Sequence, residues 1–246
     1  MRRYKTILLL AAIFIAASAL LYYLHFLIFH DPHHIFIYML GDLAFLPLEV
    51  FLVVIVIERI LARRERQSIM QKLNMVIGAF FSEVGNELLL RLSGCFQKYD
   101  EICQHLDVKG KWSHADFKNA IGWAHWFKGD PDITRINSED LRSFLVQKRQ
   151  FLLALLENPN LLEHESFTDL LWATFHLTEE LEARPSMADL PETDLHHISG
   201  DIERVYHHLI AEWLSYVEHL KANYPFLFSL VVRVQPFQKQ PSPVVV

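Results

Sequence analysis

The chain has 246 residues, with 23 Lys and Arg against 29 Asp and Glu, and 52% of its residues are hydrophobic. The charge is unevenly distributed: residues 1–72 carry 8 basic and 5 acidic side chains, whereas the remainder carries 15 and 24. Because nucleic-acid-binding domains are basic, the acidic larger part argues against nucleic acid as a partner. The eight glycines form neither a dinucleotide-binding nor a phosphate-binding loop motif, so both of those enzyme classes are unsupported.

Two apolar segments near the N-terminus are each long enough to cross a lipid bilayer. They cover residues 7–29 and 35–57, and roughly 20 residues at about 1.5 Å each span the ~30 Å hydrocarbon layer. The loop 30–34 between them contains Pro32, which favours a tight reversal. The sequence therefore predicts a transmembrane helical hairpin over residues 1–58.

Basic residues indicate the direction of this hairpin. Three precede the first apolar segment, four follow the second within residues 59–66, and the loop 30–34 has neither Lys nor Arg. The positive-inside bias then predicts an inner or plasma membrane protein with both termini and the main domain in the cytoplasm. The alternative is a signal peptide cleaved near Ala19, which leaves the main domain cytoplasmic as well. In that compartment we expect Cys95 and Cys103 to be reduced thiols.

Polar residues inside the hairpin are the first candidate functional group. Asp42 and Glu49 lie seven residues apart, so they share nearly the same helix face, and each costs a few kcal/mol if it is charged and faces lipid. They suit a proton or cation site, or the recognition of another membrane helix, with Pro47 between them loosening the backbone hydrogen bonds. The alternative is that both acids are protonated or paired within the hairpin, with His25 at a similar depth as one partner.

Helical periodicity continues through the rest of the chain. Residues 59–72 are expected to form a basic juxtamembrane linker, and residues 73–234 a cytoplasmic bundle of about six helices around one core. No period-two pattern typical of strands competes before residue 225, so the predicted fold class is all-α. Residues 235–246 contain three prolines and are expected to form a flexible tail.

Capping residues indicate where some of these helices begin. Ser113 with Asp116 resembles a capping box, and Ser166 with Asp169 is expected to cap a later helix. The apolar segment 226–234 is too short to cross a bilayer. Burial in the core, contact with the membrane surface and capture by a partner are the three alternatives for this segment.

Histidines and acids alternate along the longest predicted helix, over residues 194–222. His197, Asp201, His208 and Glu212 are separated by four, seven and four residues, so they form one line beside the apolar stripe. Such a line suits a divalent metal ion or a path for protons, because a neighbouring carboxylate fixes the tautomer of each imidazole ring.

One helix alone cannot complete a metal site, and the preceding predicted helix offers His176 and Glu180. His176 lies about 160° from the apolar stripe of that helix, so we expect it to face water. The competing interpretation of the whole line is a solvated helix flank with hydrogen bonds between residues four apart.

No motif of a nucleophilic hydrolase, zinc protease or kinase is present. The sequence favours a membrane-anchored cytoplasmic helical protein that acts by protein–protein contact, as a scaffold, adaptor or signal-coupling subunit. One alternative is a metal-dependent enzyme or sensor that uses the line on helix 194–222. Another is a subunit of an ion-coupled membrane complex through Asp42 and Glu49. The expected partners are the lipid bilayer and either a second copy of the chain or another membrane protein.

Overall fold

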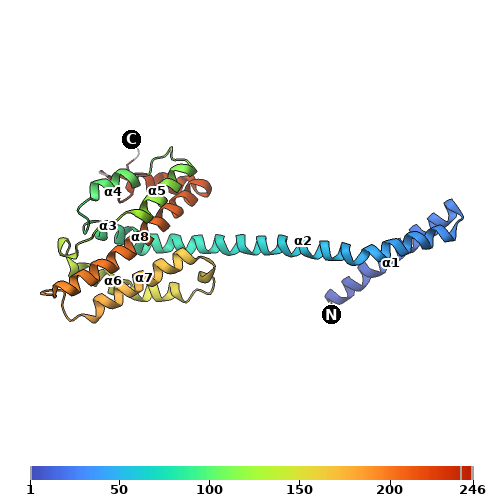
Figure 1. Ribbon diagram of the computed structural model, residues 1–246, viewed down its shortest axis with the longest axis horizontal. Helices are drawn as coiled ribbons and strands as arrows, with labels where there is room; N and C mark the ends of the chain where they lie inside the picture. The colour runs from blue at the N-terminus through green and yellow to red at the C-terminus, as the bar shows by residue number, and fades with distance from the viewer. Residues whose placement is uncertain (1, 239, 245–246) are drawn as a thin grey trace. The chain divides into compact units, whose positions relative to one another are not determined.

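All regular structure in the computed structural model is helical, and the described residues are 2–238 and 240–244 (Figure 1). No strand occurs in that part of the chain, so the all-α prediction is confirmed. The chain divides into two compact units, Met1–Glu65 and Arg66–Val246. In chain order the helices are α1 (Arg2–Phe29), α2 (Pro32–Phe80), a π-helical segment (Phe81–Gly85), α3 (Asn86–Ser93), α4 (Tyr99–Leu106), α5 (His114–Trp126), a 3-10 turn (Ile133–Arg135), α6 (Ser138–Leu156), a 3-10 turn (Leu161–Glu163), α7 (Glu165–Ala183), α8 (Glu192–Asn223) and α9 (Pro225–Val234).

The first unit consists of α1 and the beginning of α2, joined through two residues. Asp31 caps α2, since its Oδ1 accepts hydrogen bonds from the backbone N–H groups of His33 (2.9 Å) and His34 (3.2 Å). Pro32 occupies the first helical position, where a missing N–H removes no hydrogen bond. His30 has a φ of 52°, a left-handed conformation that reverses the chain between the helices.

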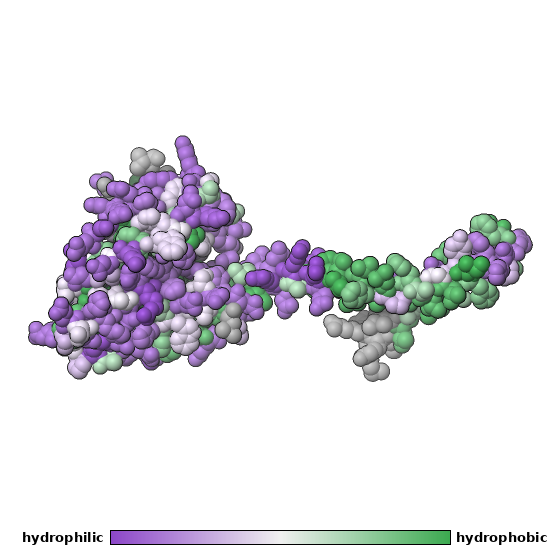
Figure 2. Space-filling model, in the orientation of Figure 1, coloured by the Kyte–Doolittle hydropathy of each residue, from purple (hydrophilic) through white to green (hydrophobic). Residues whose placement is uncertain are grey.

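Two helices in the described residues, α1 and α2, are long and apolar enough to cross a membrane. None of the apolar window of either helix is buried, so these side chains point outward from the first unit. Figure 2 shows the hydrophobic colour concentrated on these helices, while the visible face of the second unit is mainly hydrophilic. The side chains of Arg2, Arg3 and Lys5, on which part of the predicted orientation rests, lie outside the described part.

The second unit is built around α8, which packs against α7, α5, α9 and α3, while α6 packs against α7. The apolar stripes of these helices face one another, and the largest buried side chains include Trp213, Tyr206, Phe80 and Phe167. The unit contains the end of α2 and helices α3 to α9. This exceeds the expected number of about six, because a π-helical segment separates α2 from α3 and the segment 226–234 is itself helical.

The interruption is a π-helical segment, Phe81–Gly85, in which Phe81 and Val84 are buried. A Cβ atom built on Gly85 comes within 2.4 Å of Phe81 Cδ1, so glycine is required for that ring to fold back over the segment. Earlier on α2, a Cβ atom on Gly78 would lie 3.2 Å from the Tyr216 hydroxyl, so α8 approaches α2 closely at this small residue.

The capping predictions have mixed outcomes. Ser113 and Asp116 form the predicted capping box at the start of α5. The prediction for α7 is wrong: its N-cap is His164, whose Nδ1 accepts a hydrogen bond from the backbone N–H of Phe167 (3.3 Å). The Ser166 hydroxyl donates instead to the buried carboxylate of Glu212 (2.9 Å).

The structure shows how the expected linker and tail are built. Residues 59–72 are helical throughout as part of α2, and the boundary between the units falls within them. The chain after α9 does not become a tail at residue 235, because Gln235 and Phe237 are buried and the Phe237 ring packs edge-on against Trp213. The rest of the expected tail includes residues 239, 245 and 246, which lie outside the described residues.

Candidate functional site

The predicted line of histidines and acids on α8 separates into two places. His197 and Asp201 face α7 near its C-terminal half, whereas Glu212 faces the N-terminus of α7. Asp201 and Glu212 are eleven residues apart, which corresponds to about 16 Å along a helix. The four predicted ligands therefore do not meet at one point. The expectation of a solvated flank is wrong for the two acids, which are only 2% and 3% exposed.

The first place is a group of four side chains that we call the α7–α8 cluster: His176 and Glu180 from α7, and His197 and Asp201 from α8. The Nε2 atoms of His176 and His197 each lie 3.5 Å from the same oxygen, Asp201 Oδ2. The Glu180 carboxylate lies 3.9 Å from His176 Nε2 and 3.7 Å from His197 Nε2. His176 is about half exposed, as its helix position predicts, yet its ring nitrogen reaches across to α8.

Two arginines hold the carboxylates of this cluster. Arg204 Nη1 donates to Asp201 Oδ1 (2.8 Å), and Arg184 Nη1 donates to Glu180 Oε2 (2.8 Å). Arg184 also makes a bidentate pair with Asp194 at the start of α8. Hydrogen bonds from the Arg184 guanidinium lower the pKa values of Glu180 and Asp194, so both stay ionised. Asp201 Oδ2 is left buried without a hydrogen-bond partner.

The second place is a buried pair between Glu212 and the cap of α7. Glu212 Oε1 lies 3.5 Å from His164 Nε2, and Oε2 accepts the Ser166 hydrogen bond. Burial raises the pKa of Glu212, and the neighbouring His164 and Ser166 only partly oppose this. The sequence analysis did not identify His164. Its only local signal is its position just before the start of α7, and the cap of that helix was assigned to Ser166 instead.

The other predicted ligand, His208, joins neither place. It is half-buried on α8 and has no hydrogen bond or ion pair within the described residues. Burial lowers its pKa, with a smaller opposing effect from Asp169. No three His, Cys, Asp or Glu side chains in the described part are already set to hold a metal ion as they stand. The α7–α8 cluster is nevertheless where imidazoles and carboxylates from two helices come together.

In the first unit, His25 pairs with His34 rather than with either acid. Its Nε2 lies 3.4 Å from His34 Nδ1, and the two rings stack. Asp42 and Glu49 are exposed on α2, with no hydrogen bond or ion pair to any described residue. The pairing within the hairpin that the sequence suggested is therefore not seen in the described residues.

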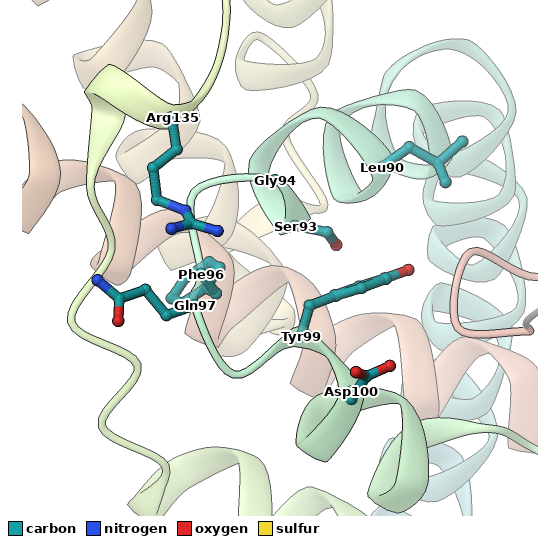
Figure 3. Close-up of a pocket in the computed structure, with 8 residues that line it drawn as sticks. All are labelled: Leu90, Ser93, Gly94, Phe96, Gln97, Tyr99, Asp100 and Arg135. Carbon is teal, nitrogen blue, oxygen red and sulfur yellow. The ribbon is translucent and has the colours of Figure 1, made fainter.

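The cavities offer less chemistry. One of about 400 Å³ is lined by α3, the loop after it, the start of α4 and Arg135 (Figure 3). No histidine or cysteine lines it, and the Ser93 hydroxyl donates to the Leu89 carbonyl (2.6 Å), so this cavity holds no activated nucleophile. Burial raises the pKa of the Cys95 thiol to about 12, which keeps it protonated and unreactive.

The short helix α9 exposes an apolar face. Phe226 is 72% exposed, and Leu230 and Val234 follow at intervals of four, so the three share one side of the helix, while Phe228 packs inward. Of the alternatives for this segment, complete burial is therefore wrong.

The comparisons with known proteins cover nearly all of the chain. Residues 2–61 match the family model described as "MJ1433, N-terminal helical domain", and residues 69–233 match "Uncharacterized protein MJ1433, C-terminal helical domain". Uncharacterized protein MJ1433 of Methanocaldococcus jannaschii is 44% identical over 240 residues, which cover 97% of this chain and 95% of that protein. No solved structure matches the chain.

Proposed function

From the premise that the chain belongs to the MJ1433 family, we propose that it is a membrane-anchored subunit that works by contact with another membrane protein. In this proposal α1 and the beginning of α2 cross the bilayer as a hairpin. The second unit then lies in the cytoplasm and forms the signal-coupling or scaffolding part of the complex.

The anchoring part of the proposal is supported by the uncovered apolar side chains of the first unit. An apolar surface of this size is unfavourable in water, whereas lipid solvates it. Four arginines follow in residues 59–66, and the loop of the hairpin has no Lys or Arg, which supports cytoplasmic ends.

Cysteine labelling tests this orientation directly, because Cys95 and Cys103 are both buried. We would place one cysteine in the first turn of α2, beside the reversal of the hairpin (His33→Cys), and one in the exposed loop before α5 (Lys111→Cys). A membrane-impermeant maleimide added to intact cells is expected to label the first variant alone, and to label the second only after lysis. Labelling of Lys111→Cys in intact cells would contradict the proposed topology.

The observation that carries the contact function is the exposure of Asp42 and Glu49 on α2 without partners. Each acid costs a few kcal/mol if it faces lipid, and polar groups at this depth are typically covered by another membrane helix. Because both acids lie on nearly the same face of α2, one partner helix could supply a hydrogen-bond donor to each of them. The same two acids would serve an ion-coupled complex, but two spans alone cannot enclose a pore, so that role also requires association.

The experiment compares the size of the complex in mild detergent for wild type and for the Asp42→Asn, Glu49→Gln double variant. Wild type is expected to migrate well above the 28.8 kDa chain, and the double variant as the free chain. Glu58→Gln removes an exposed acid beyond the apolar segment of α2 and serves as the matched control. A wild type that migrates as a single chain, or a double variant of unchanged size, contradicts the proposal. Mass spectrometry of the complex then distinguishes a second copy from another protein.

The exposed apolar face of α9 suits a second protein contact. Asn74 Nδ2 lies 3.3 Å from His219 Nδ1, and Phe81 stacks on Tyr216, so α8 runs antiparallel to the end of α2. The helix that follows α8 therefore lies at the end of the second unit where α2 enters it. If this face also contacts the partner, the Phe226→Ser, Leu230→Ser variant is expected to weaken the complex.

A further inference from the structure

We propose that the α7–α8 cluster binds one divalent transition-metal ion of the zinc class, with His176, Glu180, His197 and Asp201 as its ligands. The site is separate from the proposed membrane contact and does not depend on it. The ion would join α7 to α8 in the middle of the second unit.

The donors come from two matching sequence pairs on packed helices. His176 and Glu180 are four residues apart on α7, and His197 and Asp201 are four apart on α8, so each pair lies on one helix face. In a tetrahedral zinc site with bonds of about 2.0 to 2.2 Å, neighbouring ligand atoms lie about 3.4 Å apart. Both Nε2 atoms lie 3.5 Å from Asp201 Oδ2, and His176 Nε2 lies 3.9 Å from Glu180 Oε1, which is close to this value. His197 Nε2 lies 3.7 Å from the other oxygen of Glu180, Oε2, which Arg184 binds.

The observation that points to a ligand is the state of Asp201. This carboxylate is 2% exposed, and Oδ2 has no hydrogen-bond partner although it points between two imidazole nitrogens. Buried polar atoms are rarely left unsatisfied, because desolvation without a partner is unfavourable. A cation between the two rings satisfies Oδ2 and uses the lone pair of each Nε2.

The surrounding arginines act as the outer shell that metal ligands usually have. Arg204 binds Asp201 Oδ1 and so leaves Oδ2 free to coordinate, and Arg184 fixes Glu180 from the side of Oε2. No group of three His, Cys, Asp or Glu side chains among the described residues could hold a metal ion in the observed conformation, so binding requires the two imidazole rings to turn inward. Their side chains are 46% and 53% exposed, so this rotation needs no rearrangement of the core.

The ligand set determines the class of metal and its role. Two imidazoles with two carboxylates suit Zn²⁺ and similar borderline ions, whereas Ca²⁺ and Mg²⁺ prefer oxygen donors alone. Four protein ligands leave no open position, so the ion would be structural and would hold α7 and α8 together rather than activate water.

Metal binding by the purified full-length chain in detergent tests the proposal. After treatment with a chelator, the chain is titrated with Zn²⁺ in competition with a chromophoric chelator, and separately with Co²⁺, whose visible absorption reports tetrahedral coordination. We expect one equivalent of each metal to bind. Loss of a ligand in His176→Ala or His197→Ala is expected to weaken Zn²⁺ binding about tenfold or more, while His208→Ala, a histidine of the same helix outside the cluster, leaves it unchanged.

A second measurement separates metal binding from folding. Zn²⁺ is expected to raise the unfolding temperature of wild type and of His208→Ala, but not that of the His176→Ala, His197→Ala double variant, whose helical circular dichroism should match wild type without metal. Absence of stoichiometric Zn²⁺, or equal affinity in wild type and the double variant, overturns the proposal.

Discussion

At the scale of single residues, two buried acids of α8, Asp201 and Glu212, have different polar partners. Asp201 accepts a hydrogen bond from the Arg204 guanidinium at the α7–α8 cluster, whereas Glu212 pairs with a histidine and a serine among the described residues. The sequence places both acids in one line beside the apolar stripe of the helix. Their environments differ because Asp201 faces the C-terminal half of α7, whereas Glu212 faces the N-terminal cap of α7.

Glu212 predicts a specific dependence of stability on pH. Burial raises its pKa in the folded chain, so the folded state keeps its proton at pH values where the unfolded state has lost it. This contribution to stability is present below the unfolded pKa of about 4.3 and is lost as the pH rises through the folded pKa. The unfolding temperature of wild type should therefore fall relative to that of Glu212→Gln as the pH is raised above about 4.3. The opposite trend in thermal scans would mean that Glu212 is stabilised as an anion.

Two glycines predict opposite effects of the same substitution. A Cβ atom on Gly129 would lie 2.3 Å from the buried ring of Phe96, so Gly129→Ala should destabilise the chain by about 1 to 3 kcal/mol. Gly122 lies within α5 with open space around it, and Gly122→Ala should stabilise by up to about 1 kcal/mol. Thermal unfolding compares the two, and equal effects would contradict both assignments.

At the scale of helices, the start of α6 provides a test of which residue caps it. The Asn137 side chain accepts a hydrogen bond from the backbone N–H of Asp140 (3.1 Å), whereas Ser138 is already the first residue of the helix. Asn137→Ala should therefore cost about 1 kcal/mol, and Ser138→Ala less than about 0.5 kcal/mol. Unfolding in urea measures both, and a larger effect at Ser138 would show that the cap is misassigned.

Helix periodicity was sufficient to predict α5 to α8, because each of these helices buries one continuous apolar stripe. It could not predict the π-helical segment, which depends on how the Phe81 ring lies against Gly85. The α7–α8 cluster was only half predictable. The spacing on α8 indicates His197 and Asp201, but a single-helix projection cannot show that His176 reaches a neighbouring helix. Tertiary packing also explains Phe237, which nothing in its proline-rich surroundings marks as a core residue.

At the scale of the molecule, the full chain and a chain that lacks the first unit should respond differently to extraction of membranes with alkaline carbonate. The full chain is expected to stay with the membrane pellet, since its hairpin remains in lipid. A chain that begins at Arg66 has its own core and should be released into the supernatant. Immunoblots of both fractions measure this. Retention of the shorter chain would show that the second unit binds lipid by itself, and release of the full chain would contradict the anchor.

The late position of Phe237 has a consequence for how the protein is made. Domains generally begin to fold from the N-terminal side during synthesis, but here the ring that covers Trp213 follows α9 and is translated after every helix. Until the ribosome reaches it, the nascent helices keep part of their interior open to solvent. The core around Trp213 can therefore close only after residue 237 has left the ribosome.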